Sequence, residues 1–257
     1  MKPILTITLT LCCILLFPLN ATAQQDASPA LQQELHHLGI AAAALDHSLP
    51  SFTCQETIVS QLLYRKKVEQ QTNFTATLRV NRAADGTLAE SYFLTTLNGK
   101  PFSSGSYSIP VYVAGGFDRA MIYFLPSLQA CYRYSLSPGR IDFETAPDSA
   151  RYPLCKNEGI RGFALLDAAG NVTHLERHVS PQGAKDLRLA PFAAFDFADV
   201  DLSGRTYRLS HHLLSEIPAG RTTGRFDATY TDCHLFTATV TLGPSTEIPP
   251  DSTPKPQ

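Results

Sequence analysis

Tryptophan is absent from this chain of 257 residues, and so are the short motifs by which many enzymes are recognised. It has no Gly-x-Ser-x-Gly nucleophile elbow, no phosphate-binding glycine loop and no dinucleotide fingerprint. The paired short cysteine spacings that a zinc site would need are missing too. We therefore expect a protein that is not an enzyme and holds no metal or cofactor, although a triad assembled from distant residues would leave no such motif.

A strong charge of one sign is also lacking. Lysine and arginine number 21 against 23 acidic residues, which gives a net charge of −2. A nucleic-acid-binding protein or a polybasic membrane patch would show a basic excess. We therefore expect no nucleic-acid partner. Beyond the N-terminus, no apolar run is long enough for an integral membrane segment.

The N-terminus carries the one long apolar run of the chain. Residues 4–19 follow Lys2 and lead to the small-residue pattern Ala21-Thr22-Ala23. A positive start, a short apolar stretch and an Ala-x-Ala exit are the features that the export machinery and signal peptidase read. The sequence thus predicts a signal peptide over residues 1–23, cleavage between Ala23 and Gln24, and a periplasmic or secreted mature protein.

A retained membrane anchor and a lipoprotein are the two alternatives to cleavage. Spanning a bilayer needs about 20 consecutive apolar residues, and this run is shorter. A lipid-modified cysteine should follow the apolar region after a small residue, whereas Cys12 and Cys13 lie inside that region behind Leu11. We therefore favour cleavage over both alternatives.

The mature chain keeps an even number of cysteines, namely Cys54, Cys131, Cys155 and Cys233. In an exported protein this favours two disulfides, for which three pairings are possible. We predict that Cys131 pairs with Cys155, because this bridge would staple a proline- and glycine-rich excursion. Cys54 would then pair with Cys233 and tie the first strand to the last. If the sheet curls, we expect this second bridge to hold the curl closed.

Hydrophobic spacing predicts one helix followed by many strands. Ser28 and Pro29 indicate a helix cap followed by proline at the first helical position. Apolar residues recur at three- and four-residue steps within residues 24–48, which indicates an amphipathic N-terminal helix. The period then changes to two, and residues 49–242 form the predicted β domain of about ten antiparallel strands. A second short helix is predicted over residues 114–125, and residues 243–257 form a proline-rich tail that we expect to be disordered. The fold class is thus α+β, with helices packed on a curved antiparallel sheet.

One predicted strand has a fully apolar side, made by Phe74, Ala76, Leu78 and Val80. These residues could be ordinary core beneath the helices, or they could line a groove for an acyl chain. Alternation alone does not separate the two, because both need the same residue types. An open apolar cavity of several hundred Å³ would favour the groove, and a plugged concave side would favour the core.

His174, Glu176 and His178 share one side of another predicted strand, and two imidazoles with a carboxylate are plausible zinc ligands. The other side carries Leu175 and Val179, as expected for a half-buried strand whose polar face meets water. We favour the solvated strand face.

Asp199 opens a segment that resembles the start of a calcium loop, with Asp201 and Ser203 at alternate positions. The twelfth position of such a loop should be a bidentate glutamate, but here it is Ser210. The segment is more simply a turn between two strands.

Several segments resemble one family of exported bacterial proteins, most of them of unknown function. They are LPSFTC at 49–54, the GGF-initiated segment before Pro126, RGFALLDAAGNVTHLE at 161–176 and FDATYTDCHLF at 226–236. The family's fold is similar to the LolA-like half-barrel of periplasmic lipoprotein carriers, in which a curved sheet of about eleven strands wraps an apolar groove. The resemblance implies a protein that binds or carries a lipid or lipoprotein in the cell envelope. The alternative is an envelope interaction module with a filled core and no small ligand.

Overall fold

A computed structural model describes residues 28–103, 109–113, 117, 120–155, 159–187 and 190–236. The predicted signal peptide and the predicted C-terminal tail lie outside these residues. The described chain forms two α-helices, three short 3-10 helices and eleven strands. The helices are α1 Pro29–Ser48, η1 Ile122–Phe124, η2 Gln129–Cys131, η3 Ser149–Arg151 and α2 Pro181–Leu187. The strands are β1 Phe52–Tyr64, β2 Lys67–Arg82, β3 Leu88–Leu97, β4 Lys100–Pro101, β5 Tyr132–Ser137, β6 Arg140–Thr145, β7 Ile160–Leu166, β8 Val172–Val179, β9 Phe192–Asp201, β10 Thr206–Ala219 and β11 Thr222–Leu235.

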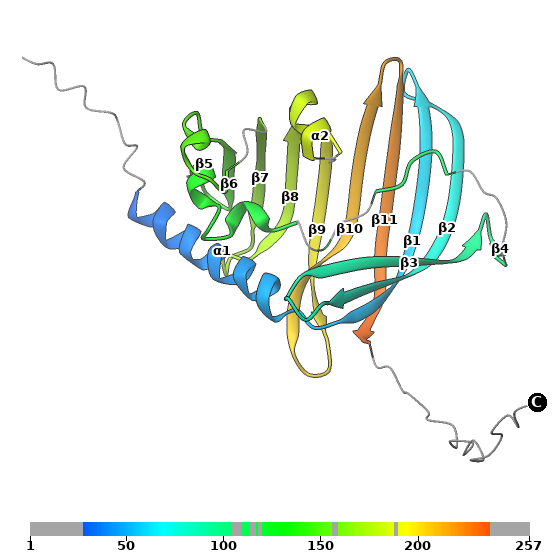
Figure 1. Ribbon diagram of the computed structural model, residues 1–257, viewed down its shortest axis with the longest axis horizontal. Coiled ribbons are helices and arrows are strands. Elements are labelled where there is room, and N and C mark those ends of the chain that lie inside the picture. Colours follow the sequence, from blue (N-terminus) through cyan, green and yellow to red (C-terminus); the bar gives the residue numbers. More distant parts are fainter. Residues whose placement is uncertain are drawn as a thin grey trace, which may run out of the picture.

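All eleven strands belong to one antiparallel sheet in the order β4-β3-β2-β1-β11-β10-β9-β8-β7-β6-β5. The sheet is curved and not closed, with β4 and β5 at its two edges (Figure 1). Helix α1 lies across one end of the strands from β5 to β10, and α2 lies at the opposite end beside β8 and β9 (Figure 1). The predicted fold class, a curved antiparallel sheet with an N-terminal helix, is confirmed.

The first and last long strands meet in the middle of the sheet. Strands β1 and β11 pair from Tyr64 opposite Thr222 to Phe52 opposite Leu235, with a bulge near Cys54. The predicted Cys54–Cys233 disulfide crosses this pair, with the two Cα atoms 4.1 Å apart. The expectation that this bridge holds the curl closed is wrong, because the hydrogen-bonded order places both strands far from the edges.

The second predicted disulfide, Cys131–Cys155, joins the end of η2 to the loop after η3, with Cα atoms 5.2 Å apart. Its loop contains the edge hairpin β5–β6. The bridge therefore staples the part of the chain that has a strand neighbour on one side only.

Helix α1 begins where the sequence indicates. The Ser28 hydroxyl accepts a hydrogen bond from the Leu31 N–H at 3.2 Å, and Pro29 occupies the first turn. Leu31, Leu38 and Ala42 are buried on the side that meets the sheet. At the other end the Arg82 guanidinium of β2 donates hydrogen bonds to the carbonyls of residues 45, 46 and 49. These bonds satisfy carbonyl groups that the end of a helix leaves unpaired.

The second predicted helix differs from the structure. In the described part of residues 114–125, the only helical turn is the three-residue η1. Met121, Tyr123 and Phe124 are all buried, so the chain is covered on more than one side. An amphipathic helix would bury one face and expose the other. The helical spacing of Phe117, Met121 and Phe124, which predicted the helix, thus belongs to residues that pack into the concave side of the sheet from more than one direction.

Candidate functional site

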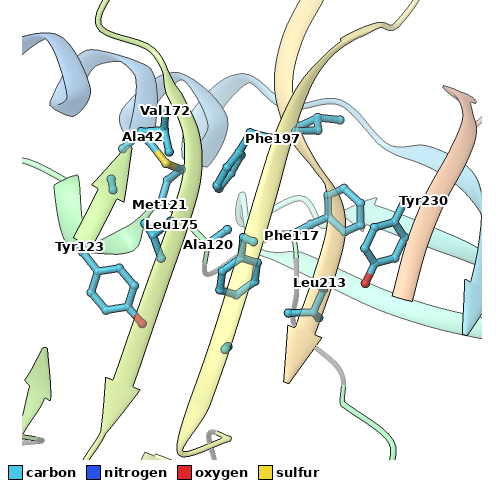
Figure 2. Close-up of a cluster of buried hydrophobic side chains, with 14 of the residues drawn as sticks. Ala42, Phe117, Ala120, Met121, Tyr123, Val172, Leu175, Phe197, Leu213 and Tyr230 are labelled. Atoms are coloured by element: carbon cyan, nitrogen blue, oxygen red, sulfur yellow. The ribbon is translucent and has the colours of Figure 1, made fainter. Parts of the chain in front are cut away.

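A pocket of about 170 Å³ lies between α1 and the ends of strands β8, β9 and β10. Its walls are mostly apolar and come from the helix, the η1 segment and the sheet: Leu38, Ala41, Leu45, Met121, Val172, Phe197 and Tyr207. Figure 2 shows Met121, Val172 and Phe197 gathered near α1 within the buried cluster. Helix α1 therefore covers an apolar hollow that the sheet alone would leave open.

The rim of this pocket is cationic. Arg208 lies there, but its guanidinium is 2.9 Å from both Asp167 and Asp199 and is neutralised by them. Arg205 is exposed, donates to the Ser48 hydroxyl at 3.3 Å, and has its guanidinium 5.1 Å from the centre of the Tyr207 ring. No acidic side chain among the described residues pairs with Arg205, so it leaves one positive charge at the pocket mouth.

Hydrogen bonds from the sheet fix the helix over the pocket. The Tyr207 hydroxyl donates to the Ser48 carbonyl at 3.2 Å. The Arg208 Nε donates to the Val172 carbonyl at 3.0 Å, which joins β10 to the start of β8. The wall and the covering helix are thus held by side chains of the pocket lining itself.

Described residues of the segment between β4 and β5 pack onto the concave side of the sheet. The Ser60 hydroxyl bonds the backbone N–H and carbonyl of Val111 at 2.9 and 2.7 Å. The Phe117 ring packs edge-on against Phe52 and Tyr230, and the Tyr123 ring stacks on Phe143 at 4.8 Å. Figure 2 shows Phe117 beside Tyr230 in this cluster.

Two hollows among the described residues are larger than the α1 pocket and lie elsewhere. One of about 610 Å³ is on the face of β5–β8 that carries arginines and acids, among them Arg140, Asp142 and Glu176. Another of about 450 Å³ lies at the start of α1 beside the turns at 137–139 and 166–170. The apolar pocket is thus smaller than the several hundred Å³ that an open carrier groove predicts.

The four residues predicted as core or groove lining lie on the inner face of β2. Phe74, Ala76, Leu78 and Val80 are all buried, and none of them lines the α1 pocket. The pocket is formed instead by α1 with β8–β10, at the other side of the central β1–β11 pair. The sequence offered no signal that α1 and β8–β10 would together form a pocket, because this depends on where the helix lies against the sheet.

A buried acid, which the sequence reading missed, lies on the inner face of β1. The Glu56 side chain is fully covered, and neither of its oxygens has a hydrogen-bond partner among the described residues. Burial raises the pKa of Glu56 to about 8; the nearby Tyr230 hydroxyl opposes this shift and the Glu90 carboxylate adds to it. Its signal was available: Glu56 occupies an inward position between Cys54 and Ile58 in the alternation of the strand.

The candidate zinc ligands are not brought together. The His178 ring lies 2.9 Å from Glu176, whereas His174 contacts Asp196 of β9 at 2.7 Å instead. Within the described ranges, no group of three or more histidine, cysteine, aspartate or glutamate side chains is placed to hold a metal ion. These residues form the polar face of β8.

A chain of alternating histidines and aspartates continues across that face. Asp196 also contacts His212 Nδ1 at 2.9 Å, and His212 Nε2 lies 2.9 Å from Asp227. Partial burial disfavours the charged imidazole, but the bonds with Asp227 and Asp196 outweigh it and raise the pKa of His212. The network joins β8, β9, β10 and β11, and its chemistry is that of a structural ion-pair ladder.

The suspected calcium loop is the turn that joins β9 to β10, as the sequence favoured. The Asp201 carboxylate accepts the Gly204 N–H at 2.9 Å, and Ser203 and Gly204 have φ angles of 57° and 84°. Asp199 turns to Arg208 instead of toward a shared centre.

No protein-family model matches the chain, and no curated protein matches it. Among solved structures it is similar to a LolA superfamily protein from Nitrosomonas europaea, with 10% identity over 80% of this chain and 94% of that one and a TM-score of 0.35. A DUF1329 family protein from Desulfovibrio piger has 11% identity over 81% and 94% of the two chains and a TM-score of 0.39. A lipovitellin structure on lipid–protein interactions has 9% identity over 76% and 26% and a TM-score of 0.22. The first of these descriptions names the LolA superfamily.

The covalent framework fits an exported protein, because disulfides persist in oxidising compartments. In the part of the chain that the structure describes, no helix is long and apolar enough to cross a membrane. The cleavage site between Ala23 and Gln24 lies outside the described residues and stays a prediction.

Proposed function

We propose that this protein is an exported, non-enzymatic component of the cell envelope that binds the apolar chain of a lipid or lipoprotein. The observation that carries the proposal is the apolar pocket of about 170 Å³ under α1. A cavity of about 150 Å³ lined by aliphatic and aromatic side chains is large enough for a benzene-sized group. The pocket therefore accommodates the end of an alkyl chain.

The pocket walls and rim differ in the way that an amphiphilic ligand requires. Apolar walls stabilise an alkyl chain by removing it from water, and Arg205 offers a positive charge at the mouth. Met121 lines the pocket and is unbranched, so its thioether can change rotamer as a chain enters. An acyl chain with an anionic or polar head matches both features.

An envelope interaction module with a filled core is the second candidate. The packing of Val111, Phe117 and Tyr123 into the concave side favours it, because that space is not open to a large ligand. The two candidates differ in one property: only the first gives saturable binding of a small alkyl ligand.

Binding of a fluorescent dodecanoyl probe to the purified mature protein tests the proposal. We expect saturable binding with the wild-type protein. The Ala41→Phe substitution places a ring in the pocket and should weaken that binding at least tenfold, because the ring occupies the space of the chain.

Ala43→Phe is the matched control, since Ala43 lies on the same helix but does not line the pocket. Circular dichroism should show that both variants keep the wild-type fold. The absence of saturable binding by the wild-type protein, or equal loss in both variants, would contradict the proposal and favour the interaction module.

A further inference from the structure

Arg177 of β8 is a buried arginine on the inner face of the sheet. Its side chain is 6% exposed, and it alternates with the buried Leu175 and Val179 along the strand. Arginine is seldom buried without a partner of opposite charge. A group of opposite charge is therefore expected close to the guanidinium.

The strands beside Arg177 supply no such partner. In the sheet register, Gly162 of β7 and Ala193 of β9 lie directly opposite it. The neighbouring acid on its own strand, Glu176, points to the other face and pairs with His178. The inward side chains next to Arg177 are therefore the hydrogen of Gly162 and the methyl group of Ala193, and neither can neutralise the charge of the guanidinium.

The hydrogen bonds of the guanidinium are almost all unused. An arginine carries five N–H donors. Among the described residues, Arg177 donates one hydrogen bond, from Nη1 to the Ala190 carbonyl at 3.4 Å. No carboxylate in the described part of the chain forms an ion pair with it. An arginine cannot lose its charge at physiological pH. None of its nitrogens is among the fully buried atoms that lack a partner, so its unbonded N–H groups meet solvent through the 6% of the side chain that is exposed.

A second unsatisfied donor lies in the same inward row. Ser215 of β10 is opposite Ala193, and its buried hydroxyl has no hydrogen-bond partner among the described residues. Ser215 is two strands from Arg177 at the same level of the sheet, whereas the guanidinium is directed along β8 to the Ala190 carbonyl, three residues from Ala193. Ser215 is therefore a separate donor, and the guanidinium, with its planar set of N–H groups, is the group from which a carboxylate or phosphate accepts.

We propose that Arg177 is the binding residue of an anion site on the inner face of the sheet, and that the site takes a carboxylate or phosphate group. The residual exposure of Arg177 leaves a small anion a way to reach it. The anion can be free in solution, or it can be the head group of an amphiphile.

This site is separate from the pocket under α1. Arg177 does not line that pocket, and Val172, which does, is five residues away along β8, or about 16 Å. Leu175 lies buried between them. The anion site therefore does not depend on the proposed acyl-chain binding, and either can fail without the other.

Thermal unfolding of the mature protein at constant ionic strength tests the site. The probes are inorganic phosphate, acetate, dodecyl phosphate and the uncharged dodecyl maltoside. For the wild-type protein we expect a saturable rise in Tm with the anions. The Arg177→Met variant should fold, because it replaces an unpaired buried charge with an apolar chain of similar length. It should lose the anion-dependent rise.

Two further variants make the result specific. Arg177→Lys keeps the charge but loses the planar fork, so we expect at least tenfold weaker anion affinity. Arg161→Met removes an exposed arginine from the neighbouring strand β7 and should leave the effect unchanged. If Arg177→Met does not fold, the comparison of Arg177→Lys with Arg161→Met decides the same question.

Each outcome has a defined meaning. A rise with inorganic phosphate or acetate alone supports a free anion, and a rise with dodecyl phosphate alone supports a head group. No saturable rise with any anion, or an equal rise in wild type and Arg177→Met, overturns the site. Stabilisation by dodecyl maltoside reports on the apolar pocket and not on Arg177.

Discussion

Glu56 on β1 and Arg177 on β8 lie on the same inner face of the sheet, but β1 is in the half that ends at edge strand β4 and β8 in the half that ends at edge strand β5. The two halves balance a buried charge differently. The Glu56 carboxyl has its pKa raised to about 8, mainly by burial, and is therefore neutral at pH 7. Arg177 has no such recourse, because a guanidinium stays protonated at any physiological pH. A buried acid can become neutral by binding a proton, whereas a buried arginine keeps its charge and is balanced only by an anion. We therefore expect a pH-dependent stability from Glu56 and anion binding at Arg177.

The same two halves differ in their disulfides. Cys54–Cys233 lies on the central β1–β11 pair and joins residues 179 positions apart in the sequence. Cys131–Cys155 lies at the β5 edge and spans 24 positions. One bridge closes a loop that contains most of the chain, and the other reinforces a single hairpin.

The largest expected effect comes from removing these bridges one at a time. Replacing Cys54 and Cys233 by serine should lower the free energy of unfolding by about 5 kcal/mol, and replacing Cys131 and Cys155 by about 3 kcal/mol, on the loop-entropy model. Urea denaturation of each double variant measures the difference. An equal cost, or a larger cost for the shorter loop, would show that native packing rather than chain closure sets the contribution.

Next in size is the pH dependence that Glu56 imposes. Its folded pKa of about 8 lies above the ordinary value of 4.5, so the folded state binds the proton more tightly. The resulting stability is fully present below pH 4.5 and is lost as pH rises to about 8. The loss amounts to about 4–5 kcal/mol for a shift of this size.

Glu56→Gln should remove this slope, because the amide does not titrate. The measurement is the difference in urea midpoint between wild type and variant from pH 5 to pH 9. Glu69→Gln, an exposed position on β2, is the control and should follow the wild-type curve. Parallel curves for wild type and Glu56→Gln would contradict the assignment.

Two glycines on the inner face give a comparison of intermediate size. A Cβ on Gly162 would lie 2.6 Å from the Phe143 ring and against the Glu176 backbone carbonyl, whereas one on Gly224 would meet the Val111 side chain at 2.5 Å. A ladder carbonyl cannot move without breaking the sheet, but a side chain outside the sheet can shift. Gly162→Ala should therefore cost about 3 kcal/mol and Gly224→Ala about 1 kcal/mol. Thermal and urea unfolding of both variants test the order, and the reverse order would place the rigid contact at Val111.

The smallest effect separates two buried serines. Ser60 bonds both backbone groups of Val111, whereas the Ser215 hydroxyl has no partner in the described structure. Ser60→Ala should destabilise the protein by about 1–2 kcal/mol, and Ser215→Ala should stabilise the anion-free protein by up to about 1 kcal/mol. Unfolding in buffer without phosphate or carboxylates measures both. Destabilisation by Ser215→Ala under those conditions would mean that the hydroxyl is already satisfied.

The sequence predicted the elements whose cause is local. The start of α1 follows from Ser28 and Pro29, which act within one turn. The turn after β9 follows from Ser203 and Gly204, because both residue types favour turns. Both have positive φ angles there, which a strand does not allow. Alternation placed Phe74 and Leu78 on one buried face. Each of these patterns is read from neighbours along the chain.

The predictions that failed depended on contacts between distant segments. In the described part of residues 114–125, where a helix was expected, the only helical turn is η1, because Met121, Tyr123 and Phe124 are packed from several sides inside the curve of the sheet. Both disulfide pairings were confirmed, and Cys54–Cys233 does tie the first long strand to the last. Only the expectation that this bridge holds the curl closed was wrong, since hydrogen bonding places β1 beside β11 at the centre. The alternation of β1 predicts that Glu56 points inward, but it does not predict that the side chain is fully buried.

The sequence by itself determined that this chain forms a helix followed by a curved antiparallel sheet with four cysteines available for bridging, because periodicity, caps and turns act over a few residues. Only the tertiary structure decided the strand order, the pocket between α1 and β8–β10, and the burial of Glu56 and Arg177 without an oppositely charged partner among the described residues. Those features arise where strands far apart in the sequence lie side by side. Whether an inward polar residue meets a partner is a property of its neighbours across the sheet, and no pattern along one strand contains that information.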